Sequence, residues 1–279
     1  MVKRIAAIND ISCFGRCSMQ VIWPVLSHFG HQVCPLPTAL LSAHTGGFDG
    51  YSFFDLSEEM EKIATHWREL DLSFDAIYSG FLGSGRQIEI VKSFINDFER
   101  ESTLVLVDPV MGDNGMIYRT YTKEMCDGIK VLCKSADVIT PNLTEAYLLL
   151  GIPYGGQPDS GKQKEMLDAL LKIGNKKRHA VIITGIHNAA QGTIGAVFAI
   201  KDHDEVIYGS SYATYCDVFF PGCGDLFSSI LLGELLNGRG IYGAIKAAVQ
   251  FISKVSSYAK RTGSPPIYGV EFEQMIRDL

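Results

Sequence analysis

The amino-acid sequence predicts an α/β protein, a three-layer α/β/α sandwich whose central sheet is mostly parallel, with an antiparallel hairpin near one edge. The first observation is that short runs of β-branched and other apolar residues alternate with longer runs of helical periodicity. This alternation is typical of parallel sheets, because each crossover lays a helix on one face of the sheet. The second is that 279 residues without an internal linker can bury one large core, so we expect a single domain over residues 1–279.

The alternating pattern places strands and helices in order along the chain. We expect strands at Arg4–Ile8, Gln32–Leu36, Asp75–Ser79, Leu104–Val107, Asp137–Ile139 and Ala180–Thr184. We expect the helices among them at Leu56–Leu70, Arg86–Arg100, Lys123–Lys134, Thr144–Leu150 and Lys162–Ile173. These strands would form the parallel part of the sheet.

After residue 190 the pattern changes. Thr193–Ile200 and Glu205–Tyr208 are separated by only a short polar stretch, which is typical of an antiparallel hairpin at a sheet edge. We expect the remaining helices at Asp225–Leu236, Tyr242–Lys260 and, as a short one, near Glu271–Ile276.

Composition and charge exclude several classes of protein. Hydrophobic residues make up 47% of the chain and charged residues 20%, as in ordinary globular enzymes. The formal net charge of −6 argues against a nucleic-acid-binding protein, and no apolar run approaches membrane-spanning length. The apolar run Ile5–Ile8 is too short for a secretion signal. The seven cysteines include no Cys-x-x-Cys pair, so we expect neither a disulfide framework nor a zinc site, and a cytoplasmic location.

The turn before the helix expected at Asp225–Leu236 has the residues needed for phosphoryl transfer. Gly222 and Gly224 allow a tight backbone that presents several N–H groups to one point, and a helix start attracts anions. Asp225 lies beside that point, where it can take a proton from an attacking hydroxyl. The alternative is an ordinary helix start that uses an acidic residue in its first turn.

Polar residues follow other expected strands as well, so that several loops can converge on one cleft at the carboxyl edge of the sheet. These loops are Asn9–Ser18, His44–Tyr51, Asp108–Tyr118, Thr140–Glu145 and Gly222–Asp225. Asp108 and Asp113 offer the hard oxygen ligands that magnesium prefers, usually through water. Taken alone, the Asp108-Pro109 pair favours a plain Asp-Pro turn over a metal site.

Asn142 and Glu145 lie one helical turn apart, so both can face the same metal-water shell. The competing interpretation is a capping box, in which Asn142 caps the helix and Glu145 is its partner.

Taken together, these loops resemble those of the ribokinase-like superfamily and, within it, the vitamin B6 (pyridoxal and pyridoxamine) kinases, nearly from end to end. Val107–Asp113 resembles the family's Asp-Pro-Val-Met/Leu-Gly segment, Thr140–Glu145 its Thr-Pro-Asn-x-x-Glu segment, and Val181–Gly185 the strand end that contacts ATP phosphates. The resemblance implies a magnesium site at Asp108, Asp113 and Glu145. It implies an ATP site at Asp108, Asp113, Thr140, Asn142, Glu145, Thr184, Gly185, Gly222 and Gly224.

Ser42–Gly47 resembles the Ser-Asn-His-Thr segment that distinguishes vitamin B6 kinases from sugar kinases. The resemblance implies that His44, Thr45 and the Gly46 amide contact the pyridine ring of the substrate. At the end of the first strand the family places a polar residue, often Ser, against the substrate, and Asp10 and Ser12 are both candidates. A buried Asp10 held by backbone N–H groups is the structural alternative.

Three positions depart from the family pattern. Cys223 stands where many relatives have Thr, Phe81 replaces a common Tyr, and Asp10 takes the place of the substrate Ser in one register. Because Cys223 lies at an expected helix start, where thiol pKa values fall, we expect an unusually reactive thiol.

The resemblance implies ATP-dependent phosphorylation of the 5′-hydroxymethyl group of pyridoxal, pyridoxine or pyridoxamine. Asp225 would be the general base, and Gly222, Cys223 and Gly224 would form the anion hole around the transferred phosphoryl group. ATP and Mg²⁺ are the expected cofactors, with a monovalent cation as a further candidate and a homodimer as the expected assembly. The alternatives are a hydroxymethylpyrimidine (phosphate) kinase and a non-catalytic pyridoxal-phosphate carrier. A sugar kinase is a further alternative that the sequence favours less.

Overall fold

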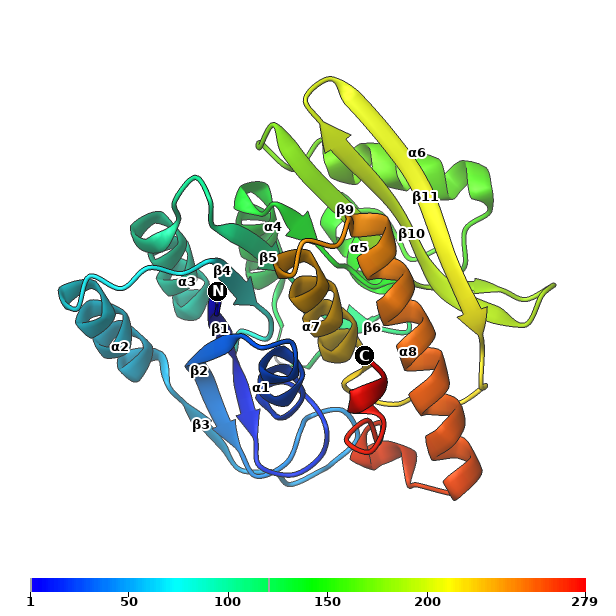
Figure 1. The fold of residues 1–279 in the computed structure, drawn as a ribbon, viewed down its shortest axis with the longest axis horizontal. Coiled ribbons are helices and arrows are strands. Elements are labelled where there is room, and N and C mark those ends of the chain that lie inside the picture. Colours follow the sequence, from blue (N-terminus) through cyan, green and yellow to red (C-terminus); the bar gives the residue numbers. More distant parts are fainter. Residues whose placement is uncertain (1, 120) are drawn as a thin grey trace.

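The computed structural model describes residues 2–119 and 121–279, and these residues form a nine-stranded sheet in the order β11-β10-β9-β8-β5-β4-β1-β2-β3 (Figure 1). A separate two-stranded ribbon joins β6 to β7. The strands are β1 (Arg4–Ser12), β2 (Gln32–Leu41), β3 (Phe53–Asp55), β4 (Ala76–Ser79), β5 (Leu104–Val107), β6 (Gly112–Asp113), β7 (Met116–Ile117), β8 (Val138–Ile139), β9 (Arg178–Asn188), β10 (Thr193–Asp202) and β11 (Glu205–Thr214).

The sheet is parallel in its centre and antiparallel at both edges. Strands β2, β1, β4, β5, β8 and β9 pair in parallel, whereas β10 and β11 form an antiparallel hairpin on β9, and β3 is antiparallel to β2. This confirms the expected α/β class and the edge hairpin. All carboxyl ends of the parallel strands therefore lie on one edge of the sheet.

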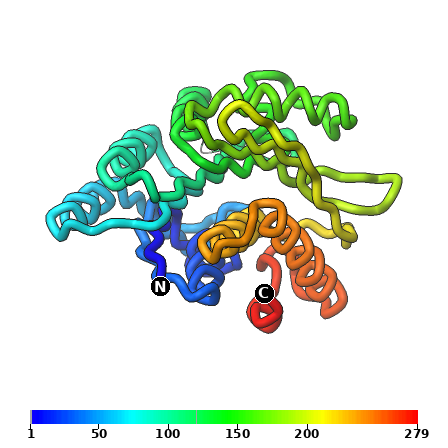
Figure 2. The backbone as a smooth tube through the Cα atoms, turned by 45° about the horizontal axis from the view of Figure 1, so that its top comes forward, coloured from blue at the N-terminus to red at the C-terminus, as the bar shows by residue number. Residues whose placement is uncertain are grey.

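Helices cover both faces of the sheet, as Figure 2 shows. The helices are α1 (Met19–His28), α2 (Ser57–Glu69), α3 (Gly85–Phe98), α4 (Lys123–Ser135), α5 (Leu143–Leu150), α6 (Ser160–Leu171), α7 (Cys223–Leu236) and α8 (Ile241–Thr262). Buried residues of α2 to α6 join one apolar cluster with the sheet, and those of α1, α7 and α8 join another. The sheet is thus the middle layer of three, as expected.

The expected short helix near Glu271–Ile276 is wrong. Val270 and Phe272 are both buried at a spacing of two, which suits an extended backbone, and only a 3₁₀ turn at Ile276–Asp278 follows.

Helix α1, which contains Pro24, was not expected from the sequence. Val21, Ile22, Val25 and Leu26 are fully buried, so packing outweighs the hydrogen bond that Pro24 cannot donate.

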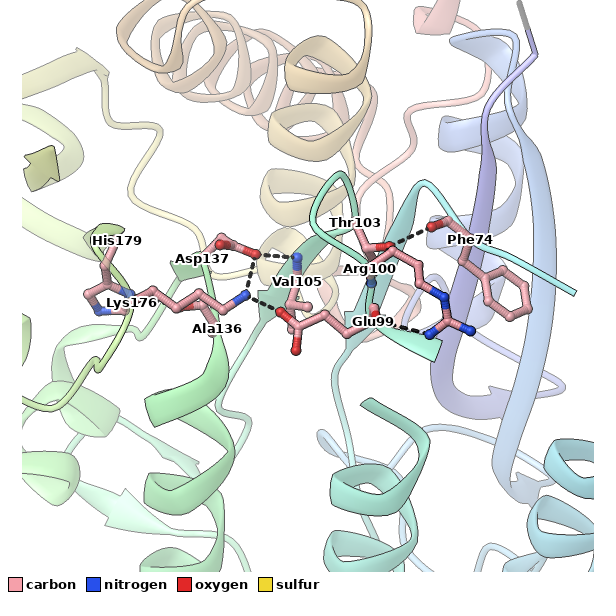
Figure 3. A network of polar contacts seen from close by, with 9 residues as sticks. All are labelled: Phe74, Glu99, Arg100, Thr103, Val105, Ala136, Asp137, Lys176 and His179. Carbon is pink, nitrogen blue, oxygen red and sulfur yellow. Dashed lines mark hydrogen bonds and ion pairs between the residues drawn. The ribbon is translucent and has the colours of Figure 1, made fainter. Parts of the chain in front are cut away.

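At the amino end of the sheet, a chain of polar contacts joins the starts of β5, β8 and β9 (Figure 3). Lys176 Nζ lies 2.6 Å from Glu99 and 2.7 Å from Asp137, and Asp137 accepts the Val105 N–H at 2.8 Å. These side chains are only 20–31% exposed, so the ion pairs are partly shielded from water. The cluster fixes the edge of the sheet opposite the carboxyl ends.

We predict that Lys176→Met will destabilise the protein by about 1–3 kcal/mol, because two half-buried carboxylates then face each other without a cation. Urea unfolding measures this. The matched control is Lys162→Met, whose partner Glu165 is 71% exposed and whose loss should cost less than about 0.5 kcal/mol. Equal unfolding midpoints for the two variants would contradict the role given to Lys176.

Candidate active site

The glycine turn before α7 has the geometry that the sequence indicated. Gly222 adopts a φ of 80°, in the left-handed region that favours glycine, and a Cβ at this position would collide with the Arg16 carbonyl oxygen. The first backbone hydrogen bond of α7 runs from the Leu226 N–H to the Gly222 carbonyl at 3.0 Å. The preceding amides of Cys223, Gly224 and Asp225 form the open end of the helix, which favours an anion.

Asp225 lies in the first turn of α7 and is held from the opposite end of the chain. Its Oδ2 accepts the Ser18 N–H at 2.8 Å, and its Oδ1 accepts the Asn9 side-chain amide at 3.3 Å. Burial raises the pKa of Asp225 to about 7, with a further contribution from the negative charge of Asp10. A carboxyl group that titrates near neutrality is suited to proton transfer at physiological pH.

Asp10 and Ser12 bond within the protein. Ser12 Oγ donates to Asp10 Oδ2 at 2.8 Å, and Ser18 Oγ donates to Asp10 Oδ1 at 2.5 Å. Asp10 is 4% exposed, and burial raises its pKa. A register shift between Asn9 and Ile11, where β1 pairs with β2, places these side chains at the strand end. Asp10 thereby braces Ser18, whose backbone N–H orients Asp225.

Asp108, at the end of β5, lies on the other side of the open helix end. A Cβ built on Gly224 would lie 3.7 Å from Asp108 Oδ2, and Ser228 Oγ donates to the same oxygen at 3.3 Å. Thr140 Oγ1 lies 2.9 Å from Ser228 Oγ, so its hydroxyl is engaged and buried. Burial raises the pKa of Asp108 to about 8, with Asp225 the second cause. The sequence analysis missed Ser228, although it lies one helical turn after Asp225.

The capping box expected as an alternative at Asn142 is present. Asn142 Oδ1 accepts the Glu145 N–H at 3.0 Å, and Glu145 Oε2 accepts the Asn142 N–H at 2.8 Å. Glu145 Oε1 also accepts the Met111 N–H at 3.1 Å, which joins α5 to the Asp108 loop. Burial raises the pKa of Glu145, followed by the charge of Asp108. The cap confirms the capping interpretation and holds Glu145 against the Asp108 loop, while the side-chain amide of Asn142 donates to the Gly112 carbonyl at 2.8 Å.

Asp113 lies at the end of the same loop, in the β6–β7 ribbon, and is half-buried. Its Oδ1 accepts the Asn114 N–H at 2.8 Å, and burial raises its pKa. Among residues 2–119 and 121–279, no three His, Cys, Asp or Glu side chains lie close enough together to hold a metal ion directly. In the same residues, no basic side chain offsets the charge of Asp108 or Asp225. The oxygen donors and this excess of negative charge fit a hydrated divalent cation.

Thr184 and Gly185 lie on β9 beside the capping box. Thr184 N–H donates to the Pro141 carbonyl at 2.9 Å, and Gly185, with a φ of 72°, is the extra residue where β9 slips against β10. The Gly185 carbonyl accepts the side-chain amide of Gln157 at 2.9 Å. The role of Gln157 was not expected from the sequence, because its partner lies 28 residues further along the chain.

His44 has a fixed tautomer. Its Nε2 lies 2.7 Å from the Ile267 carbonyl, which can only accept, so Nε2 donates and Nδ1 accepts the Gly46 N–H at 3.1 Å. The Gly46 amide is therefore engaged by His44 rather than free for a substrate. Burial lowers the pKa of His44, which favours this neutral ring. Thr45 is exposed, so its hydroxyl remains accessible.

The lowered thiol pKa on which the expected reactivity of Cys223 depends is wrong. Burial raises the pKa of Cys223 to about 12, because the apolar surroundings disfavour the thiolate more than the open helix end stabilises it.

One hollow of the surface lies between α3 and α4, lined by residues such as Gly83, Ile88 and Met125. None of its lining residues belongs to the loops around Asp225. In the part of the chain that the structure describes, the helices are too short or too polar to cross a bilayer.

The chain matches known proteins over most of its length. Residues 26–267 match the family model described as phosphomethylpyrimidine kinase. A Bacteroides thetaiotaomicron protein described as a putative phosphomethylpyrimidine kinase is 39% identical in sequence, with a TM-score of 0.93 over 99% of this chain and 93% of the other. An orthorhombic crystal form described for the same organism's protein contains pyridoxal.

Curated relatives include pyridoxal kinases. The enzyme PdxY of Actinobacillus pleuropneumoniae is 31% identical over 94% of this chain and 91% of its own length. The match to PdxY of Histophilus somni is 28% identical and spans 68% of this chain but only 65% of that relative. The chain thus belongs to the phosphomethylpyrimidine kinase family, in the ribokinase-like superfamily that also contains the pyridoxal kinases.

Proposed function

We propose that the protein transfers the γ-phosphoryl group of ATP to the 5′-hydroxymethyl group of pyridoxal, pyridoxine or pyridoxamine. The observation that carries the proposal is the Asp225 carboxyl group, fixed by Ser18 and Asn9 at the open end of α7 with a pKa of about 7. The names of the related pyridoxal kinases support the acceptor, and the relative crystallised with pyridoxal supports it further.

Asp225 accepts the proton of the hydroxymethyl group while the hydroxyl oxygen attacks the γ-phosphorus of ATP and ADP leaves. The amides of Cys223 and Gly224 at the start of α7 donate to the phosphoryl oxygens, where negative charge accumulates in the transition state. Ser18 and Asn9 keep the carboxylate directed at the acceptor. Catalysis by these residues is therefore mainly positioning and electrostatic stabilisation.

Asp108, Asp113 and Glu145 would hold magnesium through its water ligands, since the donor set is all oxygen and lacks a counter-charge. When bound, magnesium neutralises charge on the ATP phosphates. We assign the phosphates to the surface formed by Asn142, Thr184 and Gly185 together with the α7 turn. A monovalent cation at this site, a homodimeric assembly and a cytoplasmic location remain part of the proposal.

A hydroxymethylpyrimidine acceptor is the second candidate, because the matching family model is described by the pyrimidine substrate. The test is to incubate the protein with magnesium-ATP and each acceptor, and to detect the phosphorylated product by mass spectrometry. Faster turnover of the pyrimidine than of every B6 vitamer would overturn the choice of acceptor. Binding of pyridoxal phosphate without any turnover would indicate a carrier.

We predict that Asp225→Asn will lower kcat about 10²- to 10⁴-fold, because the amide cannot accept the proton, while the KM for ATP stays within about threefold. Steady-state assays with the preferred acceptor measure both constants. Asp204→Asn, in the exposed β10–β11 turn, is the matched control and should behave like wild type. Wild-type turnover in Asp225→Asn would refute the role of the base.

The pH dependence follows from the same group. Because the pKa of Asp225 is raised to about 7, the carboxyl group is protonated below that pH and cannot act as a base. We expect kcat/KM for the acceptor to fall about tenfold per pH unit well below pH 7. The residual activity of Asp225→Asn should lack this decline; a decline that persists there must come from another group.

Asp108→Asn should stabilise the ligand-free protein while impairing its use of magnesium-ATP. The folded pKa of about 8 lies above the unfolded value of 3.8, so the folded state retains a proton that the unfolded chain releases. Below about pH 4 the group is protonated in both states, so its burial costs the wild type no stability. As the pH rises towards 8, the free energy of unfolding of the wild type falls, because the unfolded chain releases a proton that the folded state retains. Urea unfolding at pH 8 should favour the variant by about 1–3 kcal/mol, with a smaller difference at pH 5. A less stable variant at pH 8 contradicts the burial effect.

A further inference from the structure

The segment that follows α8 returns to the site and contacts two of its loops. Its Pro265–Gly269 stretch, here called the C-terminal turn, contains a 3₁₀ helix at Pro266–Tyr268. The Ile267 carbonyl accepts the His44 Nε2–H at 2.7 Å, and the Tyr268 carbonyl accepts the Arg16 N–H at 3.0 Å. The C-terminal turn thus bonds to both the β1–α1 loop and the β2–β3 loop.

The same turn lies close to the phosphoryl-transfer end of α7. The Arg16 backbone packs between two glycines: it excludes any Cβ at Gly222, and a Cβ on Gly269 would approach the Arg16 carbonyl oxygen to 2.7 Å. On the second loop, a Cβ on Gly46 would lie 3.7 Å from Pro221, which directly precedes the anion hole. One layer of backbone therefore separates Tyr268 from the open end of α7.

Three aromatic rings meet where these segments converge. The Tyr268 ring centroid lies 5.1 Å from that of Phe14 and 6.4 Å from that of Phe48, with the Phe48 ring nearly parallel at 16°. Phe48 also lies 4.8 Å from the His44 ring. Phe14 and Tyr268 are 48% and 40% exposed, so ring surface remains free for a ligand.

The side chain of Arg16 anchors the turn without adding a free charge to it. Arg16 Nε lies 2.6 Å from Glu273, and its guanidinium lies 3.9 Å from Glu271. The guanidinium is thus drawn towards the C-terminal carboxylates, while its backbone stays beside the anion hole. This leaves an aromatic surface rather than a basic one next to His44, which suits a planar, uncharged ring.

We propose that Tyr268, with Phe14 and Phe48, forms an aromatic wall of the acceptor pocket and determines the preference for an aromatic alcohol; the inference rests on the function proposed above. His44 joins the wall to the loop that carries Thr45, because its neutral ring bonds that loop to the C-terminal turn. Tyr268 is a specificity-determining residue, since the reacting atoms lie at Asp225.

The test compares Tyr268→Ala with the wild type in steady-state assays. Loss of the ring should raise the KM for pyridoxal about tenfold, because an aromatic contact and its buried area are lost, and should leave the KM for ATP within about twofold. Tyr268→Leu keeps apolar bulk without the π face and should show a similar increase. Tyr268→Phe keeps the ring and should restore the wild-type KM.

Tyr242→Ala is the matched control, because Tyr242 is an exposed tyrosine of α8 whose ring packs on Phe198 instead of the site. It should change neither KM. Thermal melting of each variant separates loss of fold from loss of binding. A KM for pyridoxal that Tyr268→Ala and Tyr268→Leu leave unchanged overturns the proposal, and a changed oligomeric state in size-exclusion chromatography would then assign the rings to a contact between copies.

Calorimetric titration of pyridoxal without ATP distinguishes this inference from the proposed function. Weaker pyridoxal binding in Tyr268→Ala than in wild type supports the wall even if no acceptor is phosphorylated. Equal binding by the two proteins, with intact phosphorylation, refutes the wall and leaves the proposed function standing.

Discussion

The close packing of Gly222 against the Arg16 carbonyl is the constraint on which the site depends. It requires a residue without a Cβ and in the left-handed backbone region, and only glycine meets both conditions at low cost. The same packing brings the β1–α1 loop over the start of α7. As a result, Ser18 N–H reaches Asp225, and the amides of the helix start stay open.

Charge is distributed unevenly between the two edges of the sheet. At the amino edge, Lys176 forms ion pairs with both Glu99 and Asp137, so each of these carboxylates has a cationic partner within the protein. At the carboxyl edge, burial raises the pKa values of Asp108, Glu145 and Asp225; the charge of Asp225 raises that of Asp108 further, and the charge of Asp108 that of Glu145. The protein tolerates these clustered carboxyl groups because hydroxyl and amide donors bond each of them. Such a surface favours a cationic ligand.

Much of the fold and the local geometry of the candidate site could be predicted from the sequence. Strand–helix alternation indicated the three layers, and the glycines around Asp225 indicated the tight turn at the start of α7, because both signals are local in the sequence. The capping box at Asn142 was also predicted as one alternative. The sequence could not decide whether that cap excludes a metal site, since the answer depends on how close Glu145 lies to Asp108 in the folded protein. The contacts of Gln157, Ser228 and Ile267 were missed for the same reason: each depends on tertiary packing that no local pattern encodes.

The errors have physical causes too. Pro24 argues against a helix in the sequence, so α1 was not predicted. The helix forms because the burial of one helix face stabilises it more than one missing hydrogen bond destabilises it. At Cys223, the helix start predicted a low thiol pKa, whereas burial had the larger effect. In both cases the sequence shows the local preference, and the environment that overrides it forms only on folding.

Asp225 receives its hydrogen bonds from Asn9 and Ser18, which precede it by 216 and 207 residues. During synthesis on the ribosome, Asn9 and Ser18 therefore emerge more than 200 residues before Asp225, the partner that they bond in the folded protein. An emerging chain that stops short of α7 could pair the central strands and bond Asp10 to Ser12 and Ser18, yet its Asn9 side-chain amide and Ser18 N–H would lack the carboxylate that they bond in the complete fold. The hydrogen bonds that hold Asp225 can therefore form only after α7 has been synthesised, and chains that stop short of α7 lack them.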